Sequence, residues 1–295
     1  MYHTKTKKSS FGAIWRAKHY FFRLLFAKKQ KLIKEKPKER IFQMKKFKII
    51  ALACAFASVF TLCAHASGGA YNWYCKRAKN HTRPEAEPSM SFISECGGAY
   101  IGKNPEEKVL YLTFDAGYEN GNIARILDVL AKHKAHAAFF VLENLAVRNT
   151  ELVRRMAAEG HLVCNHTARH RDMTKMNDEA FAAELKTLED ILAEKVGVMC
   201  AKFYRPPEGR FSEKNLKAAE ALGYKTVFWS LAYADWDNEK QPEPEKSKQL
   251  LLANTHNGAV ILLHPTSKTN ADILDALLTE WEAQGYRFGT LGELF

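Results

Sequence analysis

The stretch VLYLTFD at residues 109–115 decides the fold that this sequence predicts. Six residues of high strand propensity run directly into an acidic residue. A helical periodicity follows over residues 122–134. Because an unbroken apolar strand is typical of parallel sheets that helices cover on both faces, the segment predicts the first strand–helix unit of an α/β domain.

The same unit repeats as far as the C-terminus. Predicted strands at 137–141, 161–164, 203–204, 226–230, 260–263 and 286–288 alternate with predicted helices at 150–159, 178–196, 212–222, 245–253 and 271–284. Because these units include no GxGxxG motif after the first strand, they favour a barrel over an open dinucleotide-binding sheet. We therefore expect an α/β fold, a (β/α) barrel of about seven parallel strands.

Charge is unevenly distributed along the chain. The sequence has 44 Lys and Arg against 33 Asp and Glu, a net charge of +11. Residues 1–48 hold 16 of the basic residues and two of the acidic ones, which leaves 28 against 31 for residues 49–295. Because the remaining chain is close to neutral, composition excludes a basic nucleic-acid-binding domain.

Residues 44–66 have the pattern of a secretory signal. Lys45, Lys46 and Lys48 precede an apolar run over 49–62, and the small residues of Ala64-His65-Ala66 form a cleavage site. We expect a cleaved signal peptide, with an uncleaved membrane anchor as the alternative. Either one predicts an extracytoplasmic protein.

Two further segments flank this signal. Residues 1–43 are rich in lysine and contain scattered aromatic side chains. They are either upstream sequence before a true start at Met44 or a basic helix that associates with an anionic membrane surface. Residues 67–99, with paired glycines and two prolines, predict an irregular extension, which leaves one folded domain at 100–295.

Cysteine is sparse after the signal. Cys75, Cys96, Cys164 and Cys200 include no CxxC pair, so neither a disulfide-dense scaffold nor a cysteine zinc site is indicated. Cys75 and Cys96 precede the predicted domain. They either form a disulfide outside the cell or remain free thiols, like the other two.

Polar side chains follow five of the predicted strands. They are Asp115, the pair His166 and His170, Arg205, Asp235 and His264. Because the carboxyl ends of barrel strands meet at one mouth, we expect these side chains to lie together there. The set combines a candidate base, a candidate acid, a candidate metal-binding pair and two orienting charges, which indicates a catalytic site.

Most of these residues also have a purely structural interpretation. Asp115 suits a turn or a helix N-cap, Arg205 a surface position, and His264 a buried core position. His166 and His170 are four residues apart, which places them on one face of a helical turn and suits a shared metal. Isolated HxxxH pairs also occur by chance on protein surfaces. A purely structural explanation of the whole set would need all of these interpretations to hold at once.

Five motifs in this order resemble those of the polysaccharide deacetylases, the NodB-homology family of carbohydrate esterases. They are Thr113-Phe114-Asp115, His166-Thr167-Ala168-Arg169-His170, Arg205-Pro206-Pro207-Glu208-Gly209, Asp235-Trp236 and Leu262-Leu263-His264. The resemblance runs from about Lys108 to the C-terminus and implies a distorted (β/α) barrel with a deacetylase domain at 100–295. Residues 117–121 and 228–236 resemble the branch that deacetylates N-acetylmuramic acid on the way to muramic δ-lactam in spore cortex.

The resemblance implies a role for each residue in the attack on an amide. Asp115 would be the general base, with Arg205 holding it ionised and in place. His166 and His170 would bind Zn²⁺ or a similar divalent ion.

The remaining residues would serve the oxyanion, the substrate and the leaving group. The backbone N–H of Glu208 would stabilise the tetrahedral oxyanion, and Gly209 and Trp236 would lie beside the substrate. His264 would protonate the leaving amine, with Asp235 raising its basicity and fixing its tautomer.

One departure from the family pattern affects the metal. Most members have a second Asp ligand at the position of Ala116, and a methyl group cannot bind a metal. The site would then keep two histidines and a weaker affinity unless water, substrate, Glu119 or Asn120 supplies a further ligand.

The resemblance therefore implies a metal-dependent hydrolase that removes N-acetyl groups from the glycan strands of peptidoglycan, after an amidase has trimmed the stem peptide. N-acetylmuramic acid is the expected sugar. N-acetylglucosamine in peptidoglycan or chitin-like glycans is the first alternative, and a non-catalytic protein that binds cell-wall glycans is the second.

Overall fold

The structure, a computed structural model, describes residues 69–78 and 80–295. The basic segment 1–43 and the signal or anchor segment 44–66 expected from the sequence lie outside the described residues. Within the described part, no helix combines the length and the apolar character needed to cross a bilayer.

An all-parallel sheet forms the centre of the fold. Its strand order is β10-β3-β4-β5-β6-β8-β2, and β9 also pairs with β3. The strands are β2 (Gly98–Ala99), β3 (Val109–Ala116), β4 (Ala138–Val141), β5 (Leu162–Asn165), β6 (Ala201–Tyr204), β8 (Lys225–Val227), β9 (Ala259–Leu263) and β10 (Arg287–Phe288). Seven of the eight residues of β3 are buried, as its apolar sequence predicts for a strand covered on both faces.

The sheet curls until its two sides meet. The chain beyond β8 runs beside β9, where the Ser230 and Leu231 N–H groups donate to the Val260 carbonyl at 2.9 and 3.1 Å. The Leu262 N–H donates back to the Leu231 carbonyl at 2.9 Å. The expected distorted (β/α) barrel is therefore confirmed, with its irregularity in the short strands and in a register shift at Cys164/Asn165 between β5 and β6.

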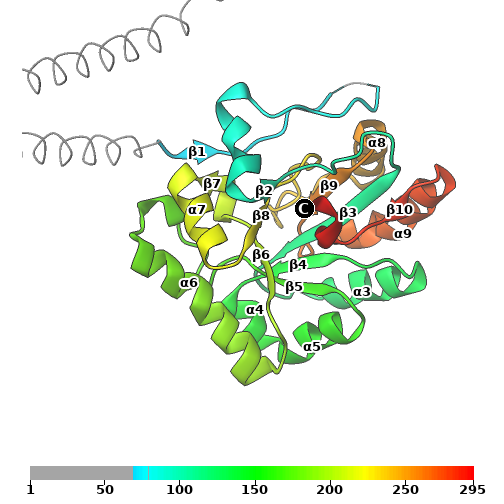
Figure 1. The fold of residues 1–295 in the computed structure, drawn as a ribbon. Helices are drawn as coiled ribbons and strands as arrows, with labels where there is room; N and C mark the ends of the chain where they lie inside the picture. Colours follow the sequence, from blue (N-terminus) through cyan, green and yellow to red (C-terminus); the bar gives the residue numbers. More distant parts are fainter. Residues whose placement is uncertain (1–68, 79) are drawn as a thin grey trace, which may run out of the picture. The chain divides into compact units, whose positions relative to one another are not determined.

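Helices surround the strands, as Figure 1 shows for α3, α4, α5 and α6. They are α3 (Ile123–Lys132), α4 (Glu143–Arg148), α5 (Thr150–Ala158), α6 (Asp178–Ile191), α7 (Glu213–Ala221), α8 (Pro244–Asn254) and α9 (Lys268–Ala283). Short helical turns are η1 (Pro88–Cys96), η2 (Met173–Lys175), η3 (Leu192–Val196), η4 (Pro207–Gly209) and η5 (Leu291–Leu294). Side chains of Asn177, Ser212 and Ser267 cap the first turns of α6, α7 and α9. The sequence did not predict α4, because six residues are too few for a helical period to be visible.

The segment before the barrel is more ordered than the sequence predicts. Within the expected irregular extension at 67–99, β1 (Tyr71–Asn72) pairs antiparallel with β7 (Arg210–Phe211), and β2 pairs with β8. Trp73 is buried in the same apolar cluster as Phe211 and Phe228. The extension is thus part of the folded domain; two-residue strands among glycines and prolines have no periodicity, and tertiary contacts alone fix them.

The cysteines of the described chain are all free thiols. Cys75 and Cys96, the pair that could have formed a disulfide, are unbonded, as are Cys164 and Cys200. The second of the two alternatives therefore describes the structure.

Candidate active site

The polar residues expected at the strand ends come together at one mouth of the barrel. Asp115 is the second-last residue of β3, while His166, Arg205 and His264 directly follow β5, β6 and β9, and Asp235 lies in the loop after β8. A cavity of about 950 Å³ opens there. Asp115, His166, His170, Glu208, Gly209, Trp236 and His264 line it. Arg205 and Asp235 lie behind this lining, and both are fully buried.

Asp115 and Arg205 form a buried ion pair. Arg205 Nη1 donates to Asp115 Oδ1 at 2.7 Å, and Nη2 donates to Thr113 Oγ1 at 2.9 Å. The guanidinium carbon lies 4.2 Å from the centre of the Phe140 ring, so the cation is held on an aromatic face. Burial alone would raise the pKa of Asp115, but Arg205 and the neighbouring His166 and His264 outweigh it and lower that pKa below its usual range. Asp115 is therefore a carboxylate at neutral pH, as a general base must be.

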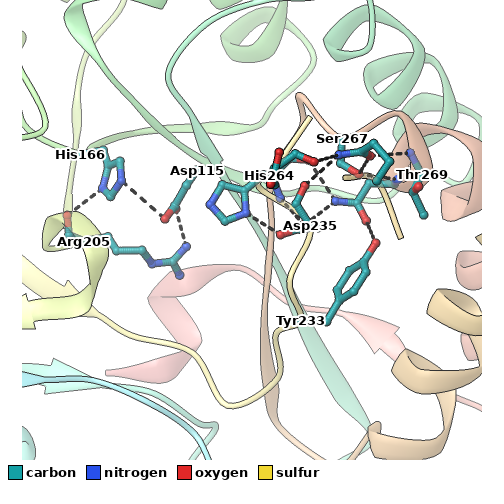
Figure 2. Close-up of polar contacts among 11 residues, drawn as sticks. Asp115, His166, Arg205, Tyr233, Asp235, His264, Ser267 and Thr269 are labelled. Carbon is teal, nitrogen blue, oxygen red and sulfur yellow. Dashed lines mark hydrogen bonds and ion pairs between the residues drawn. The ribbon is translucent and has the colours of Figure 1, made fainter. Parts of the chain in front are cut away.

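His264 and Asp235 form the second buried pair. His264 Nδ1 lies 2.7 Å from Asp235 Oδ1, and the His264 backbone N–H donates to Asp235 Oδ2 at 2.8 Å. Asn270 Nδ2 donates to the same Oδ2 at 2.6 Å. Burial lowers the pKa of His264, but the hydrogen bond and charge of Asp235 more than reverse this, and the pKa is raised. The carboxylate thus places the proton on Nδ1 and leaves Nε2 for a group in the cavity, and Figure 2 shows the ring between Asp235 and Asp115.

His166 and His170 are neighbours, but no helical turn brings them together. The residues between β5 and η2 are irregular, and Thr167 and His170 adopt left-handed conformations with φ of 72° and 55°. The His170 N–H donates to Thr167 Oγ1 at 3.0 Å, which stabilises this loop, and the two imidazole centres are 5.0 Å apart. The expected pairing is correct, while the expected helical geometry is wrong because this strand end continues into a loop.

The two histidines fit a divalent cation. His166 Nδ1 lies 2.9 Å from the Arg205 carbonyl, which can only accept a hydrogen bond, so Nδ1 carries the proton. The lone pair of Nε2 then lies 3.6 Å from Asp115 Oδ2, and two electron-rich atoms this close call for a positive group. Burial lowers the pKa of His166 to about 4, so the ring itself stays neutral, as a metal ligand must be.

Ala116 leaves this donor set incomplete. In the described part of the chain, no cluster of three or more His, Cys, Asp or Glu has the arrangement of a metal site. Glu119 does not supply the missing ligand, because its Oε2 accepts from the Ile123 N–H at 3.2 Å at the start of α3. Asn120 Nδ2 donates to the Thr266 carbonyl at 2.7 Å, and its Oδ1, the atom that could bind a metal, accepts from Asn122 Nδ2 at 3.1 Å. A metal held by His166 and His170 would therefore take its other ligands from water or substrate.

Glu208 and Gly209 have different roles in the loop after β6. Glu208 lies at the cavity in a left-handed conformation, with φ of 55°, which is uncommon for a residue with a side chain. The Gly209 N–H donates to the Pro206 carbonyl at 3.0 Å, so this amide is not free for an oxyanion. A Cβ on Gly209 would lie 2.9 Å from the Trp229 ring and 3.2 Å from Trp73 Cβ. Gly209 is therefore needed for close packing, and Glu208 remains the candidate oxyanion donor of the pair.

Several lining residues were not predicted from the sequence. Trp73, Tyr74, Cys75 and Arg77 come from the extension, Tyr118 from the loop after β3, and Trp229 from the chain after β8. The extension lies more than thirty residues before the first predicted strand end, so no local pattern associates it with the site. Tyr118 and Trp229 belong to the stretches 117–121 and 228–236, which resemble the family, and this resemblance is the one sequence feature that associates them with the site.

Comparison with known proteins gives a consistent set of relatives. Residues 102–227 match the polysaccharide deacetylase family. Over 223 residues the chain is 38% identical to peptidoglycan-N-acetylmuramic acid deacetylase PdaA of Bacillus subtilis. The aligned region covers 76% of this chain and 85% of that protein. The solved structure of PdaA, a family 4 carbohydrate esterase, matches with a TM-score of 0.73 over 76% of this chain and 96% of that chain. A peptidoglycan-N-acetylglucosamine deacetylase of Bacillus cereus is 34% identical over 210 residues, 70% of this chain and 74% of its own length.

Replacing Arg205 by Met should destabilise the protein, because it leaves the Asp115 carboxylate buried without its partner. We expect the free energy of unfolding to fall by about 3–5 kcal/mol in urea denaturation. Lys186→Met, which breaks an exposed pair with Asp190, is the control and should cost less than about 1 kcal/mol. The double variant Arg205→Met with Asp115→Asn should recover part of the loss. A loss no larger than that of the control would contradict the buried pair.

Replacing Asp235 by Asn should lower the pKa of His264. The variant removes the charge that raises this pKa and leaves the burial that lowers it. An NMR titration of the His264 imidazole in wild type and variant measures the shift. Asp272→Asn, which changes an aspartate paired with Lys268 on the surface, is the control and should leave the titration unchanged. An unshifted His264 in the Asp235 variant would rule out the pair as the cause.

Proposed function

This chain belongs to the polysaccharide deacetylase family, and on that basis we propose that it removes the N-acetyl group from N-acetylmuramic acid residues of peptidoglycan. The observation that carries the proposal is the placement in one cavity of Asp115, a candidate base with a lowered pKa, and His264, a candidate acid with a raised pKa. Hydrolysis of an amide needs both, because the attacking water must lose a proton and the amine must leave with one.

The residues divide the reaction between two steps. Asp115 takes a proton from water as the water oxygen attacks the acetyl carbon, and Arg205 keeps the carboxylate in place. The backbone N–H of Glu208 stabilises the oxyanion of the tetrahedral intermediate. His264 then protonates the nitrogen as the C–N bond breaks, which releases acetate and leaves a free amine on the sugar. Asp235 keeps His264 in the tautomer and orientation that this requires.

His166 and His170 would hold a divalent cation, for which Zn²⁺ is the first candidate. When bound, such an ion polarises the acetyl carbonyl and makes water more acidic. The neutral imidazole of His166 and the open side of the site suit a catalytic ion, which normally keeps positions for water and substrate.

The similarity to PdaA favours muramic acid as the sugar. N-acetylglucosamine is the second candidate, because the Bacillus cereus relative named for that substrate is 34% identical. A non-catalytic glycan-binding role fits less well, because such a role does not need two buried acid–base pairs that converge on one cavity.

This function has consequences for location and partners. Peptidoglycan lies outside the cytoplasmic membrane, so the protein acts there, and the signal expected at 44–66 would direct it. The basic segment 1–43 would add contact with a membrane surface if it is translated. An amidase that removes the stem peptide would act first, and formation of muramic δ-lactam in spore cortex would follow.

The function itself is tested by acetate release. We expect the full chain with added Zn²⁺ to release acetate from peptidoglycan whose muramic residues have been freed of peptide. Intact peptidoglycan and N-acetylglucosamine oligomers are the comparison substrates and should be poor. Release from the oligomers alone would favour the second sugar, and release from none would favour the binding role.

Asp115→Asn should reduce turnover by at least about a hundredfold, because an amide cannot take the proton from water. The variant should be less stable than wild type because the buried Arg205 loses its counter-charge, but Asn keeps the shape and one acceptor, and circular dichroism checks that the fold survives. Asp128→Asn, which alters an exposed aspartate beside Arg155, should retain the wild-type rate. Wild-type turnover in the Asp115 variant would exclude it as the base.

Chelation should suppress activity, and added Zn²⁺ should restore it. His166→Ala and His170→Ala should each lose bound metal, measured by elemental analysis, together with activity. His133→Ala is the control, because that histidine lies at the end of α3 with Asp275 and Glu282. Full activity in protein shown to be metal-free would end the metal hypothesis.

A further inference from the structure

Residues 71–77 cross the rim of the barrel in a fixed position. After β1 has paired with β7, the Trp73 N–H donates to the Gly209 carbonyl at 2.8 Å. Trp73 Nε1 donates to the Trp229 carbonyl at 2.9 Å, and Cys75 Sγ lies 3.0 Å from the Ser230 carbonyl. The segment is therefore bonded to the chain after β6 and to the chain after β8, which carry the catalytic loops.

This attachment adds side chains to the site that the family match does not include. Tyr74 and Arg77 line the same cavity as Asp115 and His264, although they precede the matched residues 102–227. The extension thus forms one wall of the substrate site, and a wall built from a separate segment is suited to selecting among substrates.

Arg77 is the uncompensated positive charge of this wall. The charged side chains of the lining, apart from histidines, are Arg77, Asp115 and Glu208. Asp115 is balanced by Arg205, whereas Arg77 is exposed and has no carboxylate within ion-pair distance among the described residues. Without Arg77, the acidic Glu208 would leave the wall repulsive to anions. With Arg77, this wall attracts an anion.

The rest of the mouth suits a sugar. Among the described residues, the exposed large aromatic side chains are Tyr74, Tyr118 and Trp236, at 48%, 44% and 62% exposure. All three line this cavity. Exposed aromatic rings gathered at one opening are typical of a binding site, and their flat faces fit the C–H faces of pyranose rings.

We propose that Arg77 binds the lactyl carboxylate of a muramic residue and selects that residue over glucosamine. The two sugars differ by the lactyl ether on C3, next to the carbon that bears the N-acetyl group, so the carboxylate lies close to the amide that reacts. A guanidinium binds a carboxylate through two parallel hydrogen bonds. Where a stem peptide is attached, the carboxylate has become an amide and this recognition is lost. The inference rests on the proposed function and names the residue that decides its substrate.

The test compares three substrates with the full chain: stripped muramic glycan, the same glycan with its carboxylates converted to methylamides, and N-acetylglucosamine oligomers. Arg77→Gln should lower kcat/KM on the carboxylate substrate by about ten- to a hundredfold, mainly through KM. On the methylamide the variant should equal wild type, because no charge remains to be bound. Arg77→Lys should keep part of the preference.

Lys76→Gln is the matched control. Lys76 is the neighbouring cation, is paired with Glu87 and is not part of the cavity lining, so its loss should leave all three rates unchanged. An equal loss on carboxylate and methylamide in Arg77→Gln, or no loss on either, would overturn the proposal and leave the deacetylase function standing.

A binding measurement separates this inference from the function. Calorimetry with N-acetylmuramic acid and N-acetylglucosamine should show a preference for the acid in wild type that Arg77→Gln abolishes. If the chain releases no acetate from any substrate, the proposed function fails, and this preference would still support the carboxylate site. Equal binding of both sugars by wild type would overturn it.

Discussion

The ion pair between Arg205 and Asp115 is the interaction on which the site depends. A guanidinium that is fully buried must satisfy its donors, and Arg205 does so on Asp115, Thr113 and the Val227 carbonyl. These partners come from β3 and β8, so one side chain joins three strands at the mouth of the barrel. Its backbone carbonyl also fixes the ring of His166. Charge, strand packing and histidine orientation are therefore coupled through one residue.

The pair of Asp235 and His264 has the opposite electrostatic effect, because an anion raises the pKa of His264 whereas a cation lowers the pKa of Asp115. Asp115 and His264 are largely withdrawn from water, with 10% and 25% of their side chains exposed, and this desolvation alone would favour the neutral form of each. Arg205 beside Asp115 and Asp235 beside His264 reverse that tendency, so the pKa of Asp115 is lowered and the pKa of His264 is raised. Because the two partners lie behind the cavity, the reactive atoms remain available to a substrate.

Sequence patterns located the strand ends well and the connecting geometry poorly. Asp115, His166 and His264 could be placed at one mouth because parallel barrel strands share a direction. The conformation of the loop that carries His166 and His170 could not be predicted, since its two left-handed residues, Thr167 and His170, have no sequence signature. Gly209, expected beside the substrate, lines the cavity, but its amide donates to the Pro206 carbonyl and its lack of a side chain leaves room for Trp73 and Trp229.

The sequence by itself determined the α/β alternation, the barrel and the placement of Asp115, His166, Arg205 and His264 at strand ends, because those features repeat or follow strands at short range. Only the tertiary structure decided which distant segments share the cavity. Arg77 and Tyr74 reach it through a two-residue strand and a few hydrogen bonds to loops more than a hundred residues away. Such contacts depend on the closed shape of the barrel, which brings these distant loops to the same rim, and no local stretch of sequence encodes that proximity.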